Sequence, residues 1–165
     1  MNTRNLTLLL PLIFASCGNN TKKESTTQSS KVEIANNKII SIKDIVGKTK
    51  EEVANLLGKS EKAEKVKPSN TPCAKYGCDK IFYQGGKFEV VFINDKADWI
   101  TINNTSEYSL DDNAITLLGL NQSKATFKNV SSVIRWEQIE GINEISFFNN
   151  GSNKVDYIYV KGFTK

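Results

Sequence analysis

Three short runs of aromatic and β-branched residues, separated by turn signals, constrain the fold of this chain most strongly. The runs lie at residues 80–84, 87–93 and 97–103, and they are dominated by Phe, Tyr, Trp, Val and Ile, as strands prefer. Gly85-Gly86 and Asn94-Asp95 separate them and are typical of tight turns. The pattern predicts an antiparallel meander in the middle of the chain.

The second half of the chain repeats the order of the first. Residues 117–119 repeat the Leu-Leu-Gly of residues 56–58, and residues 144–147 (Glu-Ile-Ser-Phe) repeat residues 89–92 (Glu-Val-Val-Phe). A shared order of this kind favours a tandem repeat. The alternative is that any helix followed by a meander resembles any other, and the sequence alone leaves it open.

Short helices are expected before each meander. Thr49 and Glu52 have the spacing of a capping box, so we expect a helix over residues 49–57, and a second helix is expected to begin at Ser109. Residues 39–46 fit either a strand or another short helix. The predicted fold class is therefore α+β. Two tandem helix-plus-antiparallel-meander units form one curved sheet, with the short helices packed on one face. The two units are expected at residues 39–105 and 106–165.

Strand alternation divides the meander residues between two sheet faces. The predicted inner face is uniformly apolar and carries Val90, Phe92, Ile100, Ile102, Ile145, Phe147, Ile158 and Val160. The opposite face mixes aromatic rings with carboxylates: Trp99, Tyr157, Tyr159, Glu89 and Glu144. Exposed rings are typical of binding surfaces, so these five residues are predicted to bind a partner. The alternative is that a loop, or the segment 39–46, covers this face.

The N-terminus has the layout of a secretory signal. Arg4 gives a positive start, residues 6–14 form a short apolar stretch, and Ala15-Ser16 precede Cys17. The run Phe14-Ala15-Ser16-Cys17 resembles the lipobox of bacterial lipoproteins. The resemblance implies a signal peptide at residues 1–16 and a lipid on Cys17; an ordinary signal peptide is the alternative.

A polar tether is expected to follow the lipid. Residues 17–38 are rich in Ser, Thr, Asn and Lys. They carry too few apolar groups for burial to offset the conformational entropy lost on ordering. Gly18 stands where an Asp would retain such lipoproteins at the inner membrane, so the resemblance implies the outer membrane of the cell envelope. The membrane is then contacted through the N-terminal lipid anchor.

Composition excludes several function classes. The chain has no histidine and three cysteines, so neither a four-thiolate zinc site nor a histidine-dependent triad is available, and no cofactor or metal is expected. The net charge of +4 gives no argument for a nucleic-acid partner. Cys73 and Cys78 predict a disulfide in an oxidising compartment, and Tyr76 on the loop between them is predicted to join the partner-binding surface.

Loose motifs accompany the predicted elements of the first unit: Val46-Gly47-Lys48-Thr49, Glu52-Val53 and Leu56-Leu57-Gly58. With the meanders, residues 39–165 resemble the β-lactamase-inhibitor-protein-like fold, a class that includes small outer-membrane lipoproteins of the SmpA/OmlA type. In the inhibitor family the outer concave sheet face grips a protein, so the resemblance implies that Trp99, Tyr157 and Tyr159 lie on that face. β-Lactamase inhibition is not carried over, because this chain has a lipid anchor, long loops and a second unit without cysteines.

These expectations favour a non-catalytic module that binds an unidentified envelope protein. The alternative suggested by the SmpA/OmlA likeness is a structural or assembly factor of the outer membrane. An enzymatic alternative needs only two carboxylates, and Glu89 and Glu144 share a predicted face. A glycosidase would need them roughly 5 to 9.5 Å apart.

Overall fold

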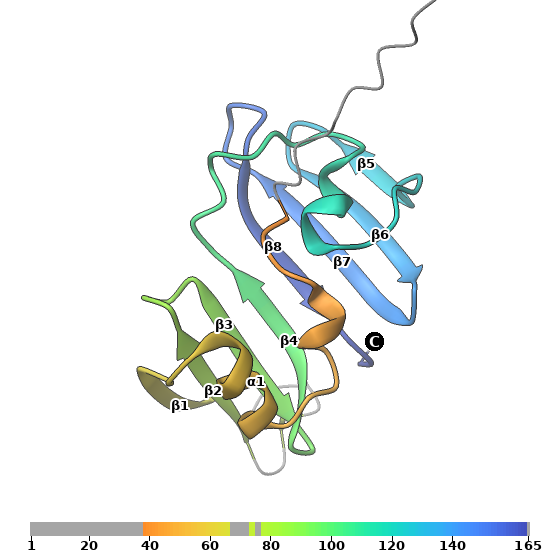
Figure 1. Cartoon of the computed structure of the whole chain (residues 1–165). Helices are drawn as coiled ribbons and strands as arrows, with labels where there is room; N and C mark the ends of the chain where they lie inside the picture. Colours follow the sequence, from red (N-terminus) through yellow and green to blue (C-terminus); the bar gives the residue numbers. More distant parts are fainter. Residues whose placement is uncertain (1–37, 67–72, 75–76, 165) are drawn as a thin grey trace, which may run out of the picture. The chain divides into compact units, whose positions relative to one another are not determined.

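A single antiparallel sheet dominates this computed structural model, which describes residues 38–66, 73–74 and 77–164. The predicted signal peptide, Cys17, the tether up to residue 37, and Tyr76 lie outside the described residues. The sheet has eight strands in the order β1-β2-β3-β4-β8-β7-β6-β5 (Figure 1). Their bounds are β1 Lys62–Val66, β2 Cys78–Tyr83, β3 Phe88–Ile93, β4 Lys96–Ile102, β5 Phe127–Asn129, β6 Val133–Ile139, β7 Ile142–Asn149 and β8 Val155–Lys161.

The strand order describes two four-stranded meanders that meet at one seam. Strands β1 to β4 follow one another across one half of the sheet, and β5 to β8 follow one another across the other half. The halves join where β4 pairs antiparallel with β8, with Ile100 opposite Val160 and Ile102 opposite Ile158. The division of the chain near residue 105, and the tandem repeat, stay predictions.

The predicted α+β class is wrong. One α-helix is present in the described part, α1 at Lys50–Leu57, together with two 3-10 segments, η1 at Ile42–Asp44 and η2 at Ala114–Leu118. Of the residues that the structure describes, 13% are helical and 43% are in strands, so the fold is mostly β. Two strands that the sequence did not suggest, β1 and β5, extend the sheet at both edges.

The helix expected to begin at Ser109 does not form, because the backbone there bonds elsewhere. Ser109 makes an isolated antiparallel bridge with Lys154, and the amide of Leu110 donates to the carbonyl of Asn153 at 3.0 Å. Only the short segment η2 follows, and Gly119 ends it in the left-handed conformation at φ 71°. A helix-plus-meander description therefore does not hold for the second half.

Three local predictions are confirmed. The side chain of Thr49 accepts from the amide of Glu52 while the Glu52 carboxylate accepts from the amide of Thr49, which is the capping box of α1. Cys73 and Cys78 form a disulfide. All eight residues of the predicted inner face are buried.

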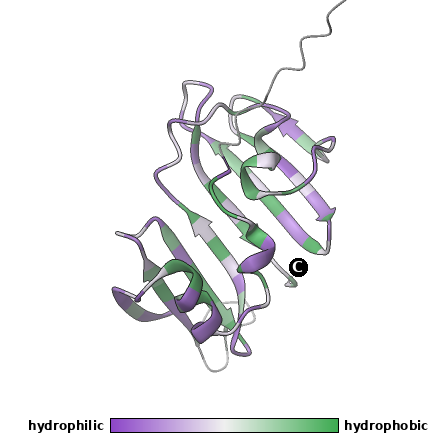
Figure 2. Ribbon diagram, viewed as in Figure 1, coloured by the Kyte–Doolittle hydropathy of each residue, from purple (hydrophilic) through white to green (hydrophobic). Residues whose placement is uncertain are grey.

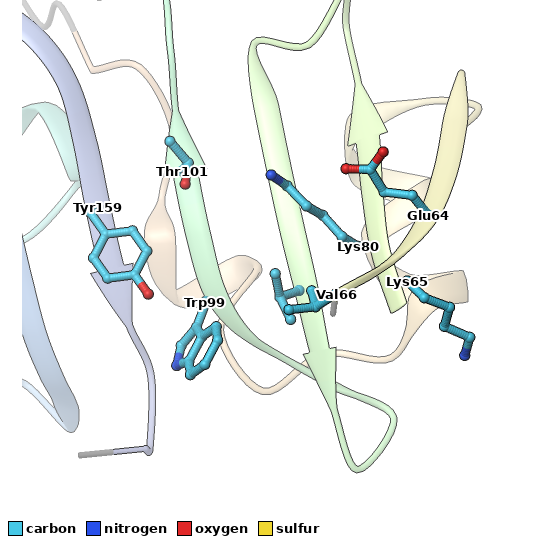
Figure 3. A pocket seen from close by; sticks show the side chains of 8 residues that line it. Glu64, Lys65, Val66, Lys80, Trp99, Thr101 and Tyr159 are labelled. Carbon is cyan, nitrogen blue, oxygen red and sulfur yellow. The ribbon is translucent and has the colours of Figure 1, made fainter. Parts of the chain in front are cut away.

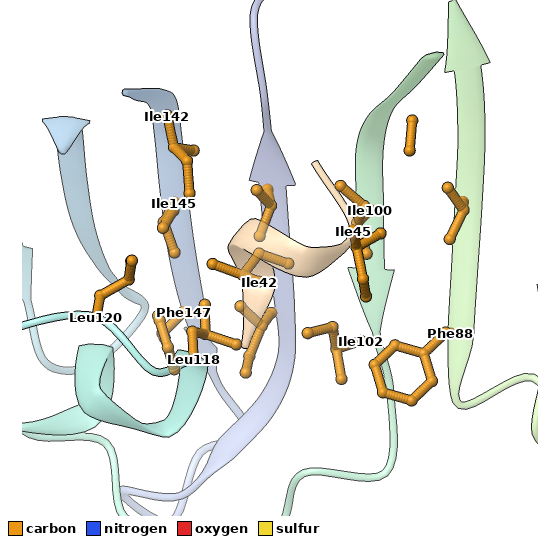
Figure 4. Close-up of a cluster of buried hydrophobic side chains, with 14 of the residues drawn as sticks. Ile42, Ile45, Phe88, Ile100, Ile102, Leu118, Leu120, Ile142, Ile145 and Phe147 are labelled. Carbon is orange, nitrogen blue, oxygen red and sulfur yellow. The ribbon is translucent and has the colours of Figure 1, made fainter. Parts of the chain in front are cut away.

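The inner face packs against the helical segments, and together they form the main core (Figure 4). Ile42 and Ile45, at the two ends of η1's turn, are both fully buried, as are Ile115 and Leu118 of η2. Residues 39–46 thus cover the inner face and leave the opposite face free of this segment. Figure 2 shows hydrophobic residues interspersed with hydrophilic ones along the strands, as expected when a sheet buries mainly one face.

Within the described ranges, no helix has the length and hydropathy of a membrane span.

Candidate functional site

The candidate site is the sheet face opposite the main core, which we call the outer face. At its centre two rows of side chains cross the seam between the meanders. One row runs Val91, Trp99, Lys161, Glu144 across β3, β4, β8 and β7, and the next runs Glu89, Thr101, Tyr159, Ser146 across the same strands. Trp99, Thr101 and Tyr159 are half-buried. The centre of the outer face is therefore aromatic and hydroxyl-bearing, with charged groups beside it.

A hollow of about 490 Å³ opens on this face between β1 and β8 (Figure 3). We call it the outer-face hollow, and it is lined by Glu64, Lys65, Val66, Lys80, Val91, Trp99, Thr101 and Tyr159. Its volume falls within the range of small-molecule pockets, roughly 300 to 1,000 Å³. Two of the predicted partner-binding residues, Trp99 and Tyr159, thus lie in one concave feature.

The C-terminal segment holds the indole of Trp99 in place. The indole Nε1 donates to Thr164 Oγ1 at 2.5 Å. The amide of Phe163 donates in turn to Asp98 Oδ1 at 2.9 Å, and Asp98 is almost fully buried. Because its polar edge is already bonded, the Trp99 ring contributes to the hollow as an apolar surface.

Tyr159 keeps a neutral hydroxyl at physiological pH. Burial, followed by the negative charges of Glu144 and Asp98, raises the pKa of Tyr159 to about 12. Thr101 lies directly opposite Tyr159 on the neighbouring strand. Within the part of the chain that the structure describes, neither hydroxyl has a hydrogen-bond partner, so both can bond to a ligand.

Glu89 and Glu144 sit on opposite sides of the aromatic centre, each in its own polar network. Glu89 pairs with Lys80 and accepts from Asn103 Nδ2 at 2.9 Å. Glu144 lies 3.2 Å from Lys161 Nζ and 3.4 Å from Arg135 Nε. Burial acts to raise the pKa of Glu144, but the hydrogen bonds from Ser146 and Lys161 and the nearby positive charges outweigh it and lower the pKa below its usual value. Both carboxylates are therefore structural partners of cations.

The distance between the two glutamates excludes them as a glycosidase pair. They lie on β3 and β7, and β4 and β8 run between those strands. Three strand spacings amount to roughly 14 Å. That separation exceeds the roughly 5 to 9.5 Å that glycoside hydrolysis requires.

Tyr157 lies on the outer face beside a second, more polar hollow. Its ring stacks on Phe148 with centroids 4.4 Å apart. The hollow beside it has a volume of about 390 Å³ and is lined by Asn103, Asn104, Thr105, Ser106, Asp156 and Tyr157. Tyr157 is thus a neighbour of the outer-face hollow and does not line it.

One corner of the outer face is covered by the chain itself. Cys73, Cys78, Val91 and Ile93 form a second, small buried cluster, with Val66 and Trp99 packed against it. The sequence alternative that a loop covers this face therefore holds at this corner. Tyr76, in the same loop, lies outside the described residues, and its predicted role stays a prediction.

The sequence missed two charged residues whose side chains face the hollow, Glu64 and Lys80. β1 was not recognised because four of its five residues are exposed and three are charged, which is typical of a sheet edge and gives no apolar alternation. One usable signal was Lys80, which lies on the outer face of β2 together with the half-buried Phe82, whereas Ile81 between them is buried.

Comparison of the chain with protein-family models, with curated proteins and with solved structures finds no match. The resemblance to the β-lactamase-inhibitor-protein-like class therefore stays a prediction. In the described ranges, no group of three or more Cys, Asp and Glu side chains has a geometry that could hold a metal ion.

Proposed function

We propose that this chain is a lipid-anchored protein of a bacterial cell envelope whose folded part binds another protein, without catalysis, through the outer face. The observation that carries the binding proposal is the half-buried aromatic centre formed by Trp99, Tyr157 and Tyr159. The helical segments η1, η2 and α1 do not cover these rings, because their buried residues belong to the main core. Aromatic residues are enriched at the energetic centres of protein interfaces.

The surroundings of this aromatic centre fit an interface. Lys80 with Glu89 on one side, and Lys161 with Glu144 on the other, are partly exposed ion pairs. An apolar centre within a polar rim is the usual anatomy of protein interfaces. Because the charges of the rim are already paired within the chain, we expect the rim to contribute more to the orientation and specificity of the bound partner than to the strength of binding.

The anchor proposal is supported by the sequence. Arg4, the apolar residues 6–14 and the small residues before Cys17 form the lipobox-like signal. If the tether predicted from the sequence behaves as a coil of about 20 residues, its mean reach would be roughly 25 Å, enough for the folded part to meet a partner beside the membrane.

Photocrosslinking in cells tests the binding face. A photoreactive amino acid replaces Thr101 or Phe148 on the outer face, and, as the matched control, Asn55 on the exposed side of α1. We expect both outer-face positions to give the same discrete adduct and the α1 position to give none. An adduct formed equally from Asn55 would contradict the proposal.

Two variants then test the aromatic centre itself. The triple change Trp99→Ala, Tyr157→Ala and Tyr159→Ala is expected to abolish the adduct from Phe148. Because three truncations can unfold the protein, Thr101→Arg, which leaves the main core untouched, is tested in parallel and is expected to weaken the adduct at least about tenfold. An undiminished adduct in a folded Thr101→Arg protein would overturn the binding face.

Metabolic labelling with a palmitate analogue tests the anchor separately. The wild-type chain is expected to incorporate the label and to sediment with membranes. Cys17→Ser is expected to lose both properties, and retention of the label in this variant would contradict the assigned lipid site.

A further inference from the structure

The outer-face hollow combines one apolar ring with several hydrogen-bonding groups. Trp99 contributes its indole ring, while Thr101 and Tyr159 contribute hydroxyls that have no partner among the described residues. In Figure 3 the side chain of Lys80 extends towards Thr101, and the ring of Tyr159 lies beside Trp99. The hollow therefore offers an apolar surface on one side and donors and acceptors around it.

The charges that line the hollow are already compensated. Lys80 pairs with Glu89, and Glu64 lies 2.9 Å from Lys62. The ammonium of Lys65 points away from the hollow and lies 2.5 Å from Asp79 (Figure 3). A charged ligand would have to compete with these pairs and would gain little net attraction. The ligand that suits the hollow is therefore neutral, with hydroxyl or amide groups of its own.

A neutral ligand with both an apolar face and a polar edge has a definite chemistry. In a pyranose ring the axial C–H groups of one face are apolar, and hydroxyls surround the ring edge. Such a ring can stack on an indole while its hydroxyls bond to nearby side chains. The volume of about 490 Å³ accommodates one or two such rings.

We propose that the outer-face hollow is a binding site for a neutral saccharide, with a pyranose ring stacked on Trp99 and its hydroxyls bonded to Thr101 and Tyr159. Lys80 donates to a further hydroxyl without losing Glu89, because an ammonium group has three donors. Tyr159 stays a neutral donor and acceptor well above physiological pH. The inference goes beyond the proposed protein partner and stands without it.

The two tryptophans of the chain supply the readout. Trp99 lines the hollow, whereas Trp136 is 1% exposed in the main core and donates from Nε1 to Ser123 O at 3.0 Å. In ¹⁵N-labelled full chain, purified in a detergent that contains no sugar, the two indole N–H resonances report on the site and on an internal control in the same sample. The probes are cellobiose, maltose, N,N′-diacetylchitobiose and, as a charged comparison, glucuronic acid.

At least one neutral disaccharide is expected to shift the Trp99 resonance saturably in the millimolar range, and Trp136 is expected to stay unmoved. Saturation transfer from the protein is expected to reach the C–H groups of one ring face. Glucuronic acid is expected to bind more weakly than the neutral sugars. The same chemistry would recognise a free sugar or one unit of a longer glycan. Tighter binding of a tetrasaccharide than of the disaccharide would identify the longer glycan as the ligand.

Conservative variants separate the site from the stability of the fold. Thr101→Val and Tyr159→Phe remove one hydroxyl each with little change of shape, and each is expected to weaken binding about fivefold. The matched control is Tyr108→Phe, which removes the hydroxyl of a half-buried ring that does not line the hollow. This control is expected to bind as the wild type does.

Three results would overturn the proposal. One is the absence of any saturable Trp99 shift up to about 50 mM of every neutral probe. Another is tighter binding of glucuronic acid than of the neutral sugars. The third is undiminished binding in both Thr101→Val and Tyr159→Phe. A crosslinked protein partner without sugar binding would leave the proposed function standing and remove only this inference.

Discussion

Asp79 links three elements through two lysines. Its carboxylate lies 2.5 Å from Lys50 on α1 and 2.5 Å from Lys65 on β1, while Asp79 itself belongs to β2. The hydrogen bond from Lys50, followed by that from Lys65, lowers the pKa of Asp79 below its ordinary value. The hydrogen bond to Asp79 also raises the pKa of Lys50. The helix and the edge strand are thus both tied to one residue.

The lowered pKa of Asp79 predicts a pH-dependent contribution to stability. Its pairs stabilise the fold above about pH 4, where the unfolded chain is also ionised, and this is lost as the pH falls through the lower folded-state pKa. Asp79→Asn is expected to lower the free energy of unfolding at pH 7 by about 1 kcal/mol, since the lysines are partly exposed. The difference from wild type should disappear near about pH 2, as measured by urea unfolding.

Asp95 provides the matched control. Its carboxylate lies 3.6 Å from the same Lys50, but its side chain is 89% exposed. Asp95→Asn is expected to change the free energy of unfolding by less than about 0.5 kcal/mol. A constant gap between wild type and Asp79→Asn across the whole pH range would contradict the role given to Asp79.

At the scale of elements, α1 depends on its first turn and on two buried residues. The helix has only eight residues, of which Val53 and Leu57 are buried. A helix this short is marginal in water by itself, so its capping box and its packing must stabilise it. The capping box was recognisable from the sequence because it requires only Thr49 and a Glu three residues later.

Thr49→Ala is therefore expected to lower the free energy of unfolding by about 1 kcal/mol. The loss comes from the amide of Glu52, which no longer has an acceptor at the helix start. Denaturant unfolding followed by circular dichroism measures the effect. Asn55→Ala, at an exposed position in the same helix, should leave stability unchanged or raise it slightly, and an equal loss in both variants would argue against the cap.

Elements without a local signal were missed or misjudged. β1 and β5 are short edge strands with mainly exposed residues, so neither carries the alternation that identified β3, β4, β7 and β8. The helix expected from Ser109 had a helical sequence pattern, but bonds from Ser109 and Leu110 to the distant residues Lys154 and Asn153 replaced it. Tertiary pairing of this kind overrides local propensity.

At the scale of the whole molecule, the seam between β4 and β8 unites the two meanders. Ile158 is fully buried there and pairs with Ile102 on one side and Phe147 on the other. The residues of both meanders belong to one main core. We therefore expect the folded part to unfold in a single cooperative step.

Ile158→Ala tests this unity. The cavity is expected to cost about 2 to 5 kcal/mol of unfolding free energy. Native-state hydrogen exchange should show the loss equally in β2 and β3 of one meander and in β6 and β7 of the other. Asp156→Ala, an exposed change on the same strand, is the control. Faster exchange confined to one meander would show that the seam does not couple the halves.

The amino-acid sequence by itself determined the strands, turns and caps that depend on neighbours a few residues apart. Alternation along β3, β4, β7 and β8 sorted Val90 and Ile158 inward and Trp99 and Tyr159 outward, since period-two alternation places alternate residues on opposite faces. Only the tertiary structure decided that β4 pairs with β8, that the edge strand β1 brings Glu64 and Val66 to the wall of the hollow, and that residues 109–110 bond to the β7–β8 turn. These contacts join residues far apart in the chain, and their free energy arises from packing and backbone pairing that no local pattern records.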